Sequence, residues 1–433
     1  MSLYTKRIID DELDELITGL AALALEGPKG VGKTASAERR AGTVHRLDTP
    51  ATKAIALADP RVLLDGRPPV LLDEWQHVPA IWDAVRHAVD QDATPGRFLL
   101  TGSSLPRKAP THSGAGRIVR VRMRPLSLVE RALEAPTVSL ASLFTGEKRP
   151  IAGTTNIGLR EYVAEIVSSG FPGIRPLRGR ARSAQLDGYI DRIIDRDFAE
   201  QGHAVRQPQI LRRWLTAFAA ATGTTTALEK IRNAATTGTE HVPAKTTVIA
   251  YREVLEGLWL LDQVPGWVPS RNHLSRVTQM PKHYLADPAL AARLLGADEE
   301  ALLSGAPVGA GILGDVPRHH TPRDGTLLGQ LFESLIAQSL QVYAQAAEAR
   351  LRHLRTQDGR KEVDFIIENR AHRVLAVEVK ASADVSDRDV AHLLWLRDQL
   401  GDDVRDLVLV NTGTHAYRRP DGVAVVPAVL LGP

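Results

Sequence analysis

Residues Gly27 to Thr34, GPKGVGKT, match the phosphate-binding loop pattern G-x-x-x-x-G-K-(S/T) at every specified position. In this pattern the glycines let backbone N–H groups close on a phosphate chain, Lys33 reaches the outer phosphates and the Thr34 hydroxyl ligates Mg²⁺. We therefore predict that ATP and Mg²⁺ bind at this loop, which comprises Gly27, Pro28, Lys29, Gly30, Val31, Gly32, Lys33 and Thr34.

Two carboxylates follow an apolar run about 40 residues after the loop, in PVLLDEWQ. A buried strand that ends in Asp73 and Glu74 would bring both acids to the edge of a parallel sheet, where the phosphate loop also lies. There we expect Asp73 to hold Mg²⁺ through water and Glu74 to polarise the attacking water.

Further polar residues follow the next apolar run, RFLLTGSS. Thr101 or Ser103 can contact the γ-phosphate from that strand end, although these are also ordinary turn residues. In the glycine-rich SGAGR, Arg117 can act as an arginine finger or γ-phosphate contact, or be a surface arginine in a loop. The candidate catalytic residues of the ATPase are thus Lys33, Glu74, Ser103 and Arg117.

A second group of acids lies near the C-terminus. EVDFII and LAVEVKA alternate so that a hairpin turning near Ala371 would set Asp364 opposite Glu378, with Lys380 on the same face as Glu378. Glu333 lies at the edge of the apolar face of a predicted helix, GQLFESLIAQSL. Converging carboxylates need a cation, and oxygen ligands suit Mg²⁺ or Mn²⁺. The alternative is that VEVK is an ordinary strand with one solvent-facing side.

The elements that position these residues predict an α/β protein. Strand-like LAALALE precedes the loop and helix-like ASAERRA follows it, as a parallel-sheet P-loop core requires. We divide the chain into a P-loop ATPase core (1–131), a helical lid (132–204), a winged-helix-like domain (205–275), a glycine- and proline-rich connector (276–320) and a mixed α/β domain (321–433).

Three predicted helices followed by short strands give the middle region the outline of a winged helix. Such modules bind DNA or serve as protein-interaction or spacing elements. If this one binds DNA, the third helix and the wing offer Lys245, Thr246, Thr247, Tyr251, Arg252 and Arg271.

Composition sets only broad limits on function. The 433 residues carry a formal net charge of +3 with a pI of about 9.1, and arginines cluster between Ile174 and Arg213, which indicates either a polyanionic partner or a solvated surface. The absence of cysteine excludes disulfides and thiolate chemistry. No apolar run approaches the roughly 20 residues that span a bilayer, so we expect a cytoplasmic protein without a membrane segment.

Several stretches resemble one family, the prokaryotic AAA+ type ATPases that carry a C-terminal domain of unknown function. They include LDTPATKAIALADPRVLLDGRPPVLLDEWQHVP, FLLTGSS, RPLSLVE, SSGFPGIR, YIDRIIDRDF, PKHYLADPAL, GQLFESL and VEVKAS. The resemblance covers most of the chain and implies an ATP-binding core, a helical middle, a winged-helix-like element and a nuclease-like end.

The C-terminal spacing, Asp then thirteen residues then Glu-x-Lys, resembles the PD-(D/E)XK restriction-endonuclease-like core. By that resemblance Asp364 and Glu378 bind metal, Lys380 orients the attacking water and Glu333 is the preceding helical acid.

Two hypotheses of function follow. In the first, the protein is an ATPase that couples nucleotide state to a DNA-associated, metal-dependent nuclease-like domain; a third possibility, a defence or toxin-like system acting on the host's own nucleic acid, has the same sequence features. In the second, the protein is a nucleotide-controlled switch or scaffold that binds a partner and cuts nothing. Homo-oligomerisation is compatible with both.

Overall fold

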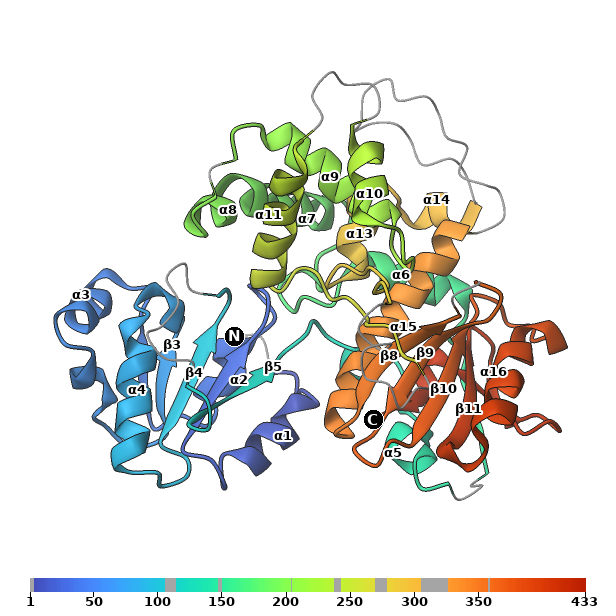
Figure 1. Ribbon diagram of the computed structural model, residues 1–433, viewed down its shortest axis with the longest axis horizontal. Helices are drawn as coiled ribbons and strands as arrows, with labels where there is room; N and C mark the ends of the chain where they lie inside the picture. Colours follow the sequence, from blue (N-terminus) through green and yellow to red (C-terminus); the bar gives the residue numbers. More distant parts are fainter. Residues whose placement is uncertain are drawn as a thin grey trace.

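The computed structural model describes residues 4–105, 114–146, 150–203, 205–236, 243–268, 279–304, 326–356 and 359–433. Figure 1 shows an N-terminal sheet, a group of helices from the middle of the chain and a second, C-terminal sheet. No helix within these ranges is both long enough and apolar enough to cross a membrane.

The N-terminal sheet is parallel throughout, with strand order β2-β3-β4-β1-β5. Its strands are β1 (Ala22–Glu26), β2 (Thr43–Arg46), β3 (Val70–Asp73), β4 (Phe98–Gly102) and β5 (Ile118–Arg122). Every residue of β1, β3 and β4 is buried, as expected for central strands covered on both faces. The predicted α/β class with a parallel P-loop core is confirmed.

Alternate residues of β1 explain how both faces are covered. Leu23 and Leu25 join the cluster that contains residues of α1 and α2, whereas Ala22 and Ala24 join the cluster that contains residues of α4. The helical segments here are α1 (Ile9–Leu16), α2 (Lys33–Glu38), α3 (Pro50–Ala58), η1 (Pro60–Leu64), η2 (Trp75–His77), α4 (Ala80–Gln91) and η3 (Val129–Arg131).

Helices dominate the middle region. They are α6 (Leu159–Ser168), α7 (Gly179–Arg192), a π-helical turn η4 (Ile193–Asp197), α8 (Phe198–Glu200), α9 (Pro208–Ala220), α10 (Leu228–Ala235) and α11 (Lys245–Gly257). After α11 the chain forms a short antiparallel ribbon, residues 260–264 with 282–286, through the bridges Leu261 with Leu285 and Val264 with Lys282. We call this pair of segments the ribbon.

Residues 282–304 differ from the expected connector, because they form the second half of the ribbon and the helices α13 (Pro288–Leu294) and α14 (Glu299–Ser304). Asp287 accepts a hydrogen bond from the Ala289 backbone N–H at 2.8 Å and so caps α13, whose first residue is proline. Asp287 and Pro288 are thus a local signal for the start of a helix. The prediction of a connector relied instead on the glycine and proline residues that follow from Gly296. Connector residues 305–320 lie outside the described ranges.

The C-terminal sheet is mixed, with strand order β7-β12-β13-β11-β10-β9-β8. Strands β8, β9 and β10 pair antiparallel, whereas β10, β11 and β13 pair parallel. Its elements in chain order are α15 (Thr326–Ala346), β8 (Arg350–Arg355), β9 (Glu362–Glu368), β10 (Val374–Val379), α16 (Asp387–Leu400), η5 (Gly401–Asp403), β11 (Val404–Asn411), β12 (His415–Arg418), β13 (Ala424–Pro427), η6 (Ala428–Leu430) and β14 (Leu431–Gly432).

Residues 138–146 and 150–154 also differ from expectation, because they join the C-terminal half instead of a lid. They form β6 (Val138–Ser139), α5 (Leu140–Leu143) and β7 (Gly153–Thr154). Strand β7 pairs with β12, and β6 pairs with β14 at the end of the chain. The physical reason is that such short strands carry little periodic signal and are fixed by partners 261 to 293 residues away in sequence.

Candidate functional sites

The phosphate loop connects the end of β1 to the start of α2, and its glycines are required by the backbone. Gly30 and Gly32 have φ values of +82° and +102°, a region that other residues rarely adopt. A Cβ on Gly27 would lie 2.1 Å from the Met123 carbonyl oxygen. The loop can therefore approach its surroundings closely only with glycine at these positions.

Lys33 is turned back onto the loop. Its Nζ donates to the carbonyl oxygens of Gly27 at 2.9 Å and Pro28 at 3.0 Å, and the residue is buried. Burial lowers the pKa of Lys33 to about 8, against the attraction of Glu74 and Asp73. An anion at the loop would offset this desolvation.

Asp73, at the end of β3, gathers hydroxyl groups from two other elements. Its Oδ1 accepts from Thr34 Oγ1 at 2.7 Å and from Thr101 Oγ1 at 2.5 Å. Burial raises the pKa of Asp73, and the two hydroxyl donors oppose that shift. The carboxylate and the Thr34 hydroxyl are hard oxygen donors next to a phosphate loop, so they fit Mg²⁺.

Glu74 is held in a fixed orientation beside Asp73. Its backbone is left-handed, with φ +57°, and its N–H donates to Thr101 Oγ1 at 3.0 Å. Its carboxylate accepts from Ser103 Oγ at 2.6 Å and from the Gln76 amide. The structure thus brings Glu74 and Ser103 together, and it adds Gln76, which no sequence motif indicated.

Arg117 lies away from this edge. It precedes β5, whose first residue, Ile118, pairs with Ala22 at the start of β1, whereas the loop follows the end of β1. A strand of five residues separates the two by roughly 16 Å. Its Nε instead pairs with Asp90 Oδ1 at 2.7 Å. The expected γ-phosphate contact within the same chain is therefore wrong; a finger that reaches a neighbouring copy stays a prediction.

The helical region contacts the loop directly. Lys29 Nζ pairs with Asp197 Oδ1 at 2.7 Å and Glu200 Oε2 at 3.3 Å, and Tyr189 Oη donates to the Lys29 carbonyl at 3.1 Å. A cavity of about 450 Å³ is lined by residues of both regions, including Lys29, Gln76 and Arg196. The segment YIDRIIDRDF quoted from the sequence carries these contacts, but neither Arg196 nor Asp197 was singled out.

On the other side of the loop lies a cavity of about 570 Å³, lined among others by Tyr4, Arg7, Gly32, Ala35 and Arg175. Arg7 is fixed by two contacts: its guanidinium pairs with Glu130 at 2.9 Å and donates a hydrogen bond to the Val31 carbonyl at 2.8 Å. From the middle region, Glu165 and Ser168 of α6 and the residues Pro172, Arg175, Pro176 and Arg178 that follow it also line this cavity.

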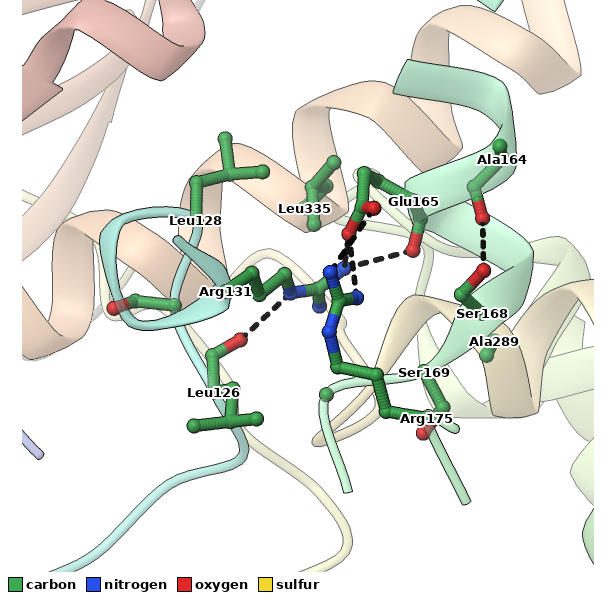
Figure 2. Close-up of polar contacts among 12 residues, drawn as sticks. Leu126, Leu128, Arg131, Ala164, Glu165, Ser168, Ser169, Arg175, Ala289 and Leu335 are labelled. Atoms are coloured by element: carbon green, nitrogen blue, oxygen red, sulfur yellow. Dashed lines mark hydrogen bonds and ion pairs between the residues drawn. The ribbon is translucent and has the colours of Figure 1, made fainter. Parts of the chain in front are cut away.

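Figure 2 shows the polar joint next to this cavity, where the guanidiniums of Arg131 and Arg175 converge on Glu165 of α6. The Arg131–Glu165 and Arg175–Glu165 distances are 3.0 and 2.6 Å. Arg131 also donates to Gln338 Oε1 of α15 at 3.2 Å. Burial alone would raise the pKa of Glu165, but the two arginines hold it below its ordinary value. The joint therefore links the end of the ATPase core, the middle helices and the C-terminal region.

In the C-terminal region, the expected hairpin of β9 and β10 is present. Val377 pairs with Phe365, so Glu378 and Asp364 are next in register. The Val379 N–H donates to Asp364 Oδ2 at 3.0 Å, and Lys380 Nζ pairs with Glu378 Oε1 at 3.0 Å. These contacts bring three of the four predicted residues to one strand end.

A lysine that sequence reasoning did not single out joins them to the fourth. Lys282 of the ribbon, 1% exposed, places its Nζ 3.0 Å from Glu333 Oε1, 3.0 Å from Asp364 Oδ1 and 3.3 Å from Glu362 Oε1. Its only sequence signal was membership of the family-like PKHYLADPAL. We refer to Glu333, Asp364, Glu378, Lys380 and Lys282 as the carboxylate cluster.

The charges in the cluster are strongly coupled. Burial and then repulsion by Asp364 raise the pKa of Glu333 to about 7 and that of Glu378 to about 8. Burial opposes charge on Lys282, but Asp364 and Glu333 raise its pKa well above the ordinary value. Burial also opposes charge on Asp364, but Lys282 lowers its pKa. Lys282 is thus a charged partner of ionised Asp364.

This arrangement does not fit a divalent ion. Mg²⁺ requires oxygen ligands at about 2.1 Å, and the ammonium of Lys282 fills the position between Glu333 and Asp364. Within the described ranges, no group of three or more acidic, histidine or cysteine side chains is arranged to hold a metal ion. Asp364 and Glu378, the predicted ligands, lie close together without forming a metal site.

The residues expected to contact DNA are partly engaged elsewhere. On α11, Lys245 pairs with Glu229 at 2.9 Å and Arg252 with Glu256 at 3.3 Å. Tyr251 packs edge-on against Phe198 and Trp214. Arg271 lies outside the described residues. DNA contact by this helix stays a prediction.

Comparison with known proteins divides the chain into three matches. Residues 21–132 match the model of an AAA domain, residues 159–301 match a domain of unknown function (DUF8612), and residues 328–431 match another (DUF4143).

Two relatives that align with most of the chain are named as uncharacterized proteins. Rv2008c of Mycobacterium tuberculosis and Mb2031c of Mycobacterium bovis are each 26% identical over 415 residues, which is 93% of this chain and 79% of theirs. Two solved structures align with 67% of this chain. The Walker-type ATPase PABY2304 of Pyrococcus abyssi has 14% identity and a TM-score of 0.38 over 96% of its length, and the ORC2 protein of Aeropyrum pernix has 16% and 0.29 over 92%. The domain match, together with the loop geometry, shows a P-loop domain similar to the AAA domain over residues 21–132, and residues 328–431 are similar to the DUF4143 domain.

Proposed function

We propose that the protein binds and hydrolyses ATP at the phosphate-loop edge and uses the nucleotide state to control its C-terminal region. The observation that carries this proposal is the convergence of Thr34, Asp73 and Glu74 beside the loop, with hydroxyl donors from the next strand holding both acids. The loop residues Gly27 to Thr34 cradle the phosphates, and Lys33 exchanges its two carbonyl partners for phosphate oxygens.

Each acid has a distinct role in hydrolysis. Thr34 and Asp73 would hold Mg²⁺, which neutralises charge on the β- and γ-phosphates. Glu74 accepts a proton from the attacking water, and Ser103 and Gln76 fix the direction of its carboxylate. Ser103, at the end of β4, is also placed to report on the γ-phosphate.

The adenosine end of ATP fits the cavity of about 570 Å³. That cavity borders Gly32 and Ala35 at the start of α2, where the phosphates end, and it includes the aromatic ring of Tyr4. Arg175 and Pro176, which follow α6, also line the cavity, so nucleotide bound there would contact both the core and the middle region.

Nucleotide state reaches the C-terminal region through two further contacts. The Arg131–Glu165 joint touches Gln338 of α15, and Arg124, just after β5, pairs with Asp262 of the ribbon at 2.7 Å. Arg131 and Arg124 both lie near the end of the ATPase domain. A shift of the lid or of β5 would therefore displace α15 and the ribbon, which these two arginines contact.

The C-terminal region can act either as a nuclease or as a switch that binds a partner, and the position of Lys282 in the carboxylate cluster favours the switch. A cluster whose centre is filled by an ammonium group binds no catalytic metal in this conformation. A switch predicts ATP binding and slow hydrolysis with no cleavage of nucleic acid.

A DNA-associated nuclease is the second candidate, favoured by the convergence of Asp364, Glu378 and Lys380 and by the order helix, three antiparallel strands, helix, parallel strand. Supercoiled and linear DNA incubated with the protein and Mg²⁺ or Mn²⁺, beside Lys380→Ala, separates the candidates. Cleavage that the substitution abolishes would establish the nuclease; intact DNA supports the switch.

The ATP site is tested by titrating a fluorescent ATP analogue into the wild type and Lys33→Ala. We expect the substitution to weaken binding at least tenfold, because one desolvated cation is lost from the phosphates. Lys230→Ala, at an exposed position of α10, is the matched control and should bind as the wild type does. Equal binding by Lys33→Ala would refute the assignment of the loop.

A further inference from the structure

A cavity of about 630 Å³ lies among the starts of α9 and α11 and the turn after α8, within the group of middle helices (Figure 1). We call it the α9–α11 groove. It is separate from the phosphate-loop edge and from the carboxylate cluster. Its apolar lining consists of Phe198, Val205, Ile210, Pro243, Ala250 and Tyr251.

The apolar lining can accept side chains from a second molecule. A volume of this size is within the range of ligand pockets, about 300–1,000 Å³. On α11, Thr246 and Ala250 line the groove, and Ile249, three residues after Thr246 and 47% exposed, lies on the same side of the helix. The apolar surface thus continues out of the groove, as it does where an amphipathic helix docks between two helices.

The polar lining of the groove carries positive charge. Arg206 and, when protonated, His203 line it, and no aspartate or glutamate within the described ranges does so. Arg206 is exposed and has no ion-pair partner among the described residues. Charge complementarity therefore favours an occupant that carries carboxylates.

Further hydrogen-bond donors border the groove. The Tyr251 hydroxyl has no hydrogen-bond partner in the described part of the chain, and burial raises its pKa, so it stays protonated and can donate. The N-cap residues of α9 and α11, Gln207 and Ala244, form no side-chain cap, and Gln207 and Thr246 line the groove. Uncapped N–H groups in a first helical turn favour anionic acceptors.

The chemistry of the lining favours a protein partner over DNA. Three residues predicted to contact DNA, Thr246, Thr247 and Tyr251, line the groove. A recognition helix reads DNA by projecting into the major groove, whereas these residues border a cavity with aliphatic and aromatic walls. Phosphates match Arg206 but not the apolar lining. An acidic protein segment with apolar side chains matches both.

The groove shares an element with the phosphate-loop edge. Phe198 of the groove directly follows Asp197, which pairs with Lys29 of the loop at 2.7 Å. Gln201 lines the cavity beside Lys29, and the next residue, Gly202, lines the groove. Residues 197–202 therefore connect the phosphate loop to the groove.

We propose that the α9–α11 groove is a docking site for an acidic amphipathic segment of a partner protein. The apolar side chains of the segment fill the groove, and its carboxylates contact Arg206 and the Tyr251 hydroxyl. This inference rests on the proposed function, because it names the kind of partner that the nucleotide-controlled switch would bind.

Two pools of phage-displayed peptides of about 15 residues test the groove on nucleotide-free, full-length protein. Both pools carry varied apolar residues at the spacing of one helix face. One pool has Asp or Glu at every other position, and the other has Lys or Arg. We expect the wild type to enrich acidic sequences, and Ala250→Phe, which adds a ring in the groove without changing its charge, to enrich none of them. Enrichment of basic sequences, of neither pool, or of the same acidic sequences by both proteins would overturn the proposal.

A second arm does not depend on how Ala250→Phe folds. Arg206 is exposed, so Arg206→Glu reverses the charge beside the groove with little effect on packing. Fluorescence anisotropy should show that this variant raises the Kd of the most enriched acidic peptide about tenfold or more. The matched control is Arg180→Glu, at an exposed position of α7 that does not line the groove, and its Kd should equal that of the wild type. An unchanged Kd in Arg206→Glu would contradict the proposal.

A labelled DNA duplex is the third probe, in the same anisotropy assay. We expect Ala250→Phe to leave the binding of the duplex unchanged. Loss of duplex binding in this variant, without competition from the acidic peptide in the wild type, would assign the groove to nucleic acid and overturn the proposal. No nucleotide is used, so none of these failures affects the ATP-binding test with Lys33→Ala.

Discussion

The phosphate-loop edge and the carboxylate cluster each bring a lysine next to acidic side chains, but the two lysines are used differently. Lys33 bonds to loop carbonyls at 2.9 and 3.0 Å, and Asp73 and Glu74 have hydroxyl and amide partners instead of a salt bridge. Lys282 bonds to the acids themselves. The first site is arranged to receive a ligand, and the second already contains its cation.

The origin of the lysines explains the difference. Lys33 belongs to the same motif as the loop it serves, so one local segment builds the phosphate site. Lys282 reaches its acids from a different element, 51 and 82 residues away in sequence. A local motif therefore predicts which acidic side chains lie together, but a residue distant in sequence, here Lys282, determines which cation they contact.

The largest effect that separates the two sites is expected from Glu74→Gln. Loss of the general base should lower ATP hydrolysis about 100- to 10,000-fold and leave ATP affinity nearly unchanged. Phosphate release and nucleotide titration measure the two quantities. Asp364→Asn is the counterpart in the cluster, and an equal loss of hydrolysis in that variant would show that the sites are one catalytic unit.

Substitutions at the joint of Arg131, Glu165 and Arg175 should lower the free energy of unfolding strongly. Glu165→Gln leaves the guanidinium of Arg131, which is fully buried, without its anion, so the free energy of unfolding should fall by roughly 3–5 kcal/mol. Glu299→Gln breaks a pair with Arg182 in which the glutamate is 46% exposed, and should cost at most about 1 kcal/mol. Chemical denaturation measures both free energies of unfolding. Similar losses in the two variants would show that the buried joint contributes no more to stability than the exposed pair.

A pH effect is expected next to the cluster. Burial lowers the pKa of His353 on β8 from 6.5 to about 4, with Lys282, Glu362 and Arg355 as its charged neighbours and the Met280 carbonyl 3.0 Å from Nε2. The unfolded chain thus binds more protons between these pH values, and stability falls as pH drops from about 6.5 to about 4, by up to roughly 3 kcal/mol. Denaturation midpoints of the wild type and His353→Asn across this range should converge at low pH; parallel profiles would contradict the assignment.

The smallest effect is expected from Ser103→Ala. Glu74 loses one of two side-chain donors, a difference of about 1 kcal/mol, so hydrolysis should fall roughly fivefold. Gln76→Ala removes the other donor and should behave alike. A loss as large as that of Glu74→Gln would make Ser103 a direct contact of the reacting phosphate.

Local sequence predicted the phosphate site well because its parts are short and consecutive. The strand, loop and helix around Gly27 to Thr34, and the apolar strand before Asp73, are present as expected. Arg117 failed because a glycine-rich setting does not reveal at which end of a strand a residue lies. Gln76 was missed because its role depends on the left-handed turn at Glu74.

The C-terminal hairpin was also predictable, since alternation fixes which residues of β9 and β10 share a face. The contents of the cluster were not. Lys282 lies in a segment interpreted as connector, and no periodicity relates the ribbon to β9 or α15. Likewise, Asp197 reaches Lys29 across 168 positions of sequence, a contact that only tertiary packing determines.

The pairing of β6 with β14 has a consequence for the order in which the chain can fold. Val138 and Ser139 leave the ribosome long before Leu431 and Gly432, and Ser139 Oγ donates to the Pro433 carbonyl at 2.6 Å. Strand β7 likewise waits for β12. During synthesis the segment 138–154 has no completed sheet to join, so a fragment that starts at residue 321 would lack one edge strand and the partner of its last residues. Expression boundaries for the C-terminal region should therefore include the segment 138–154, supplied in the same chain or as a separate peptide.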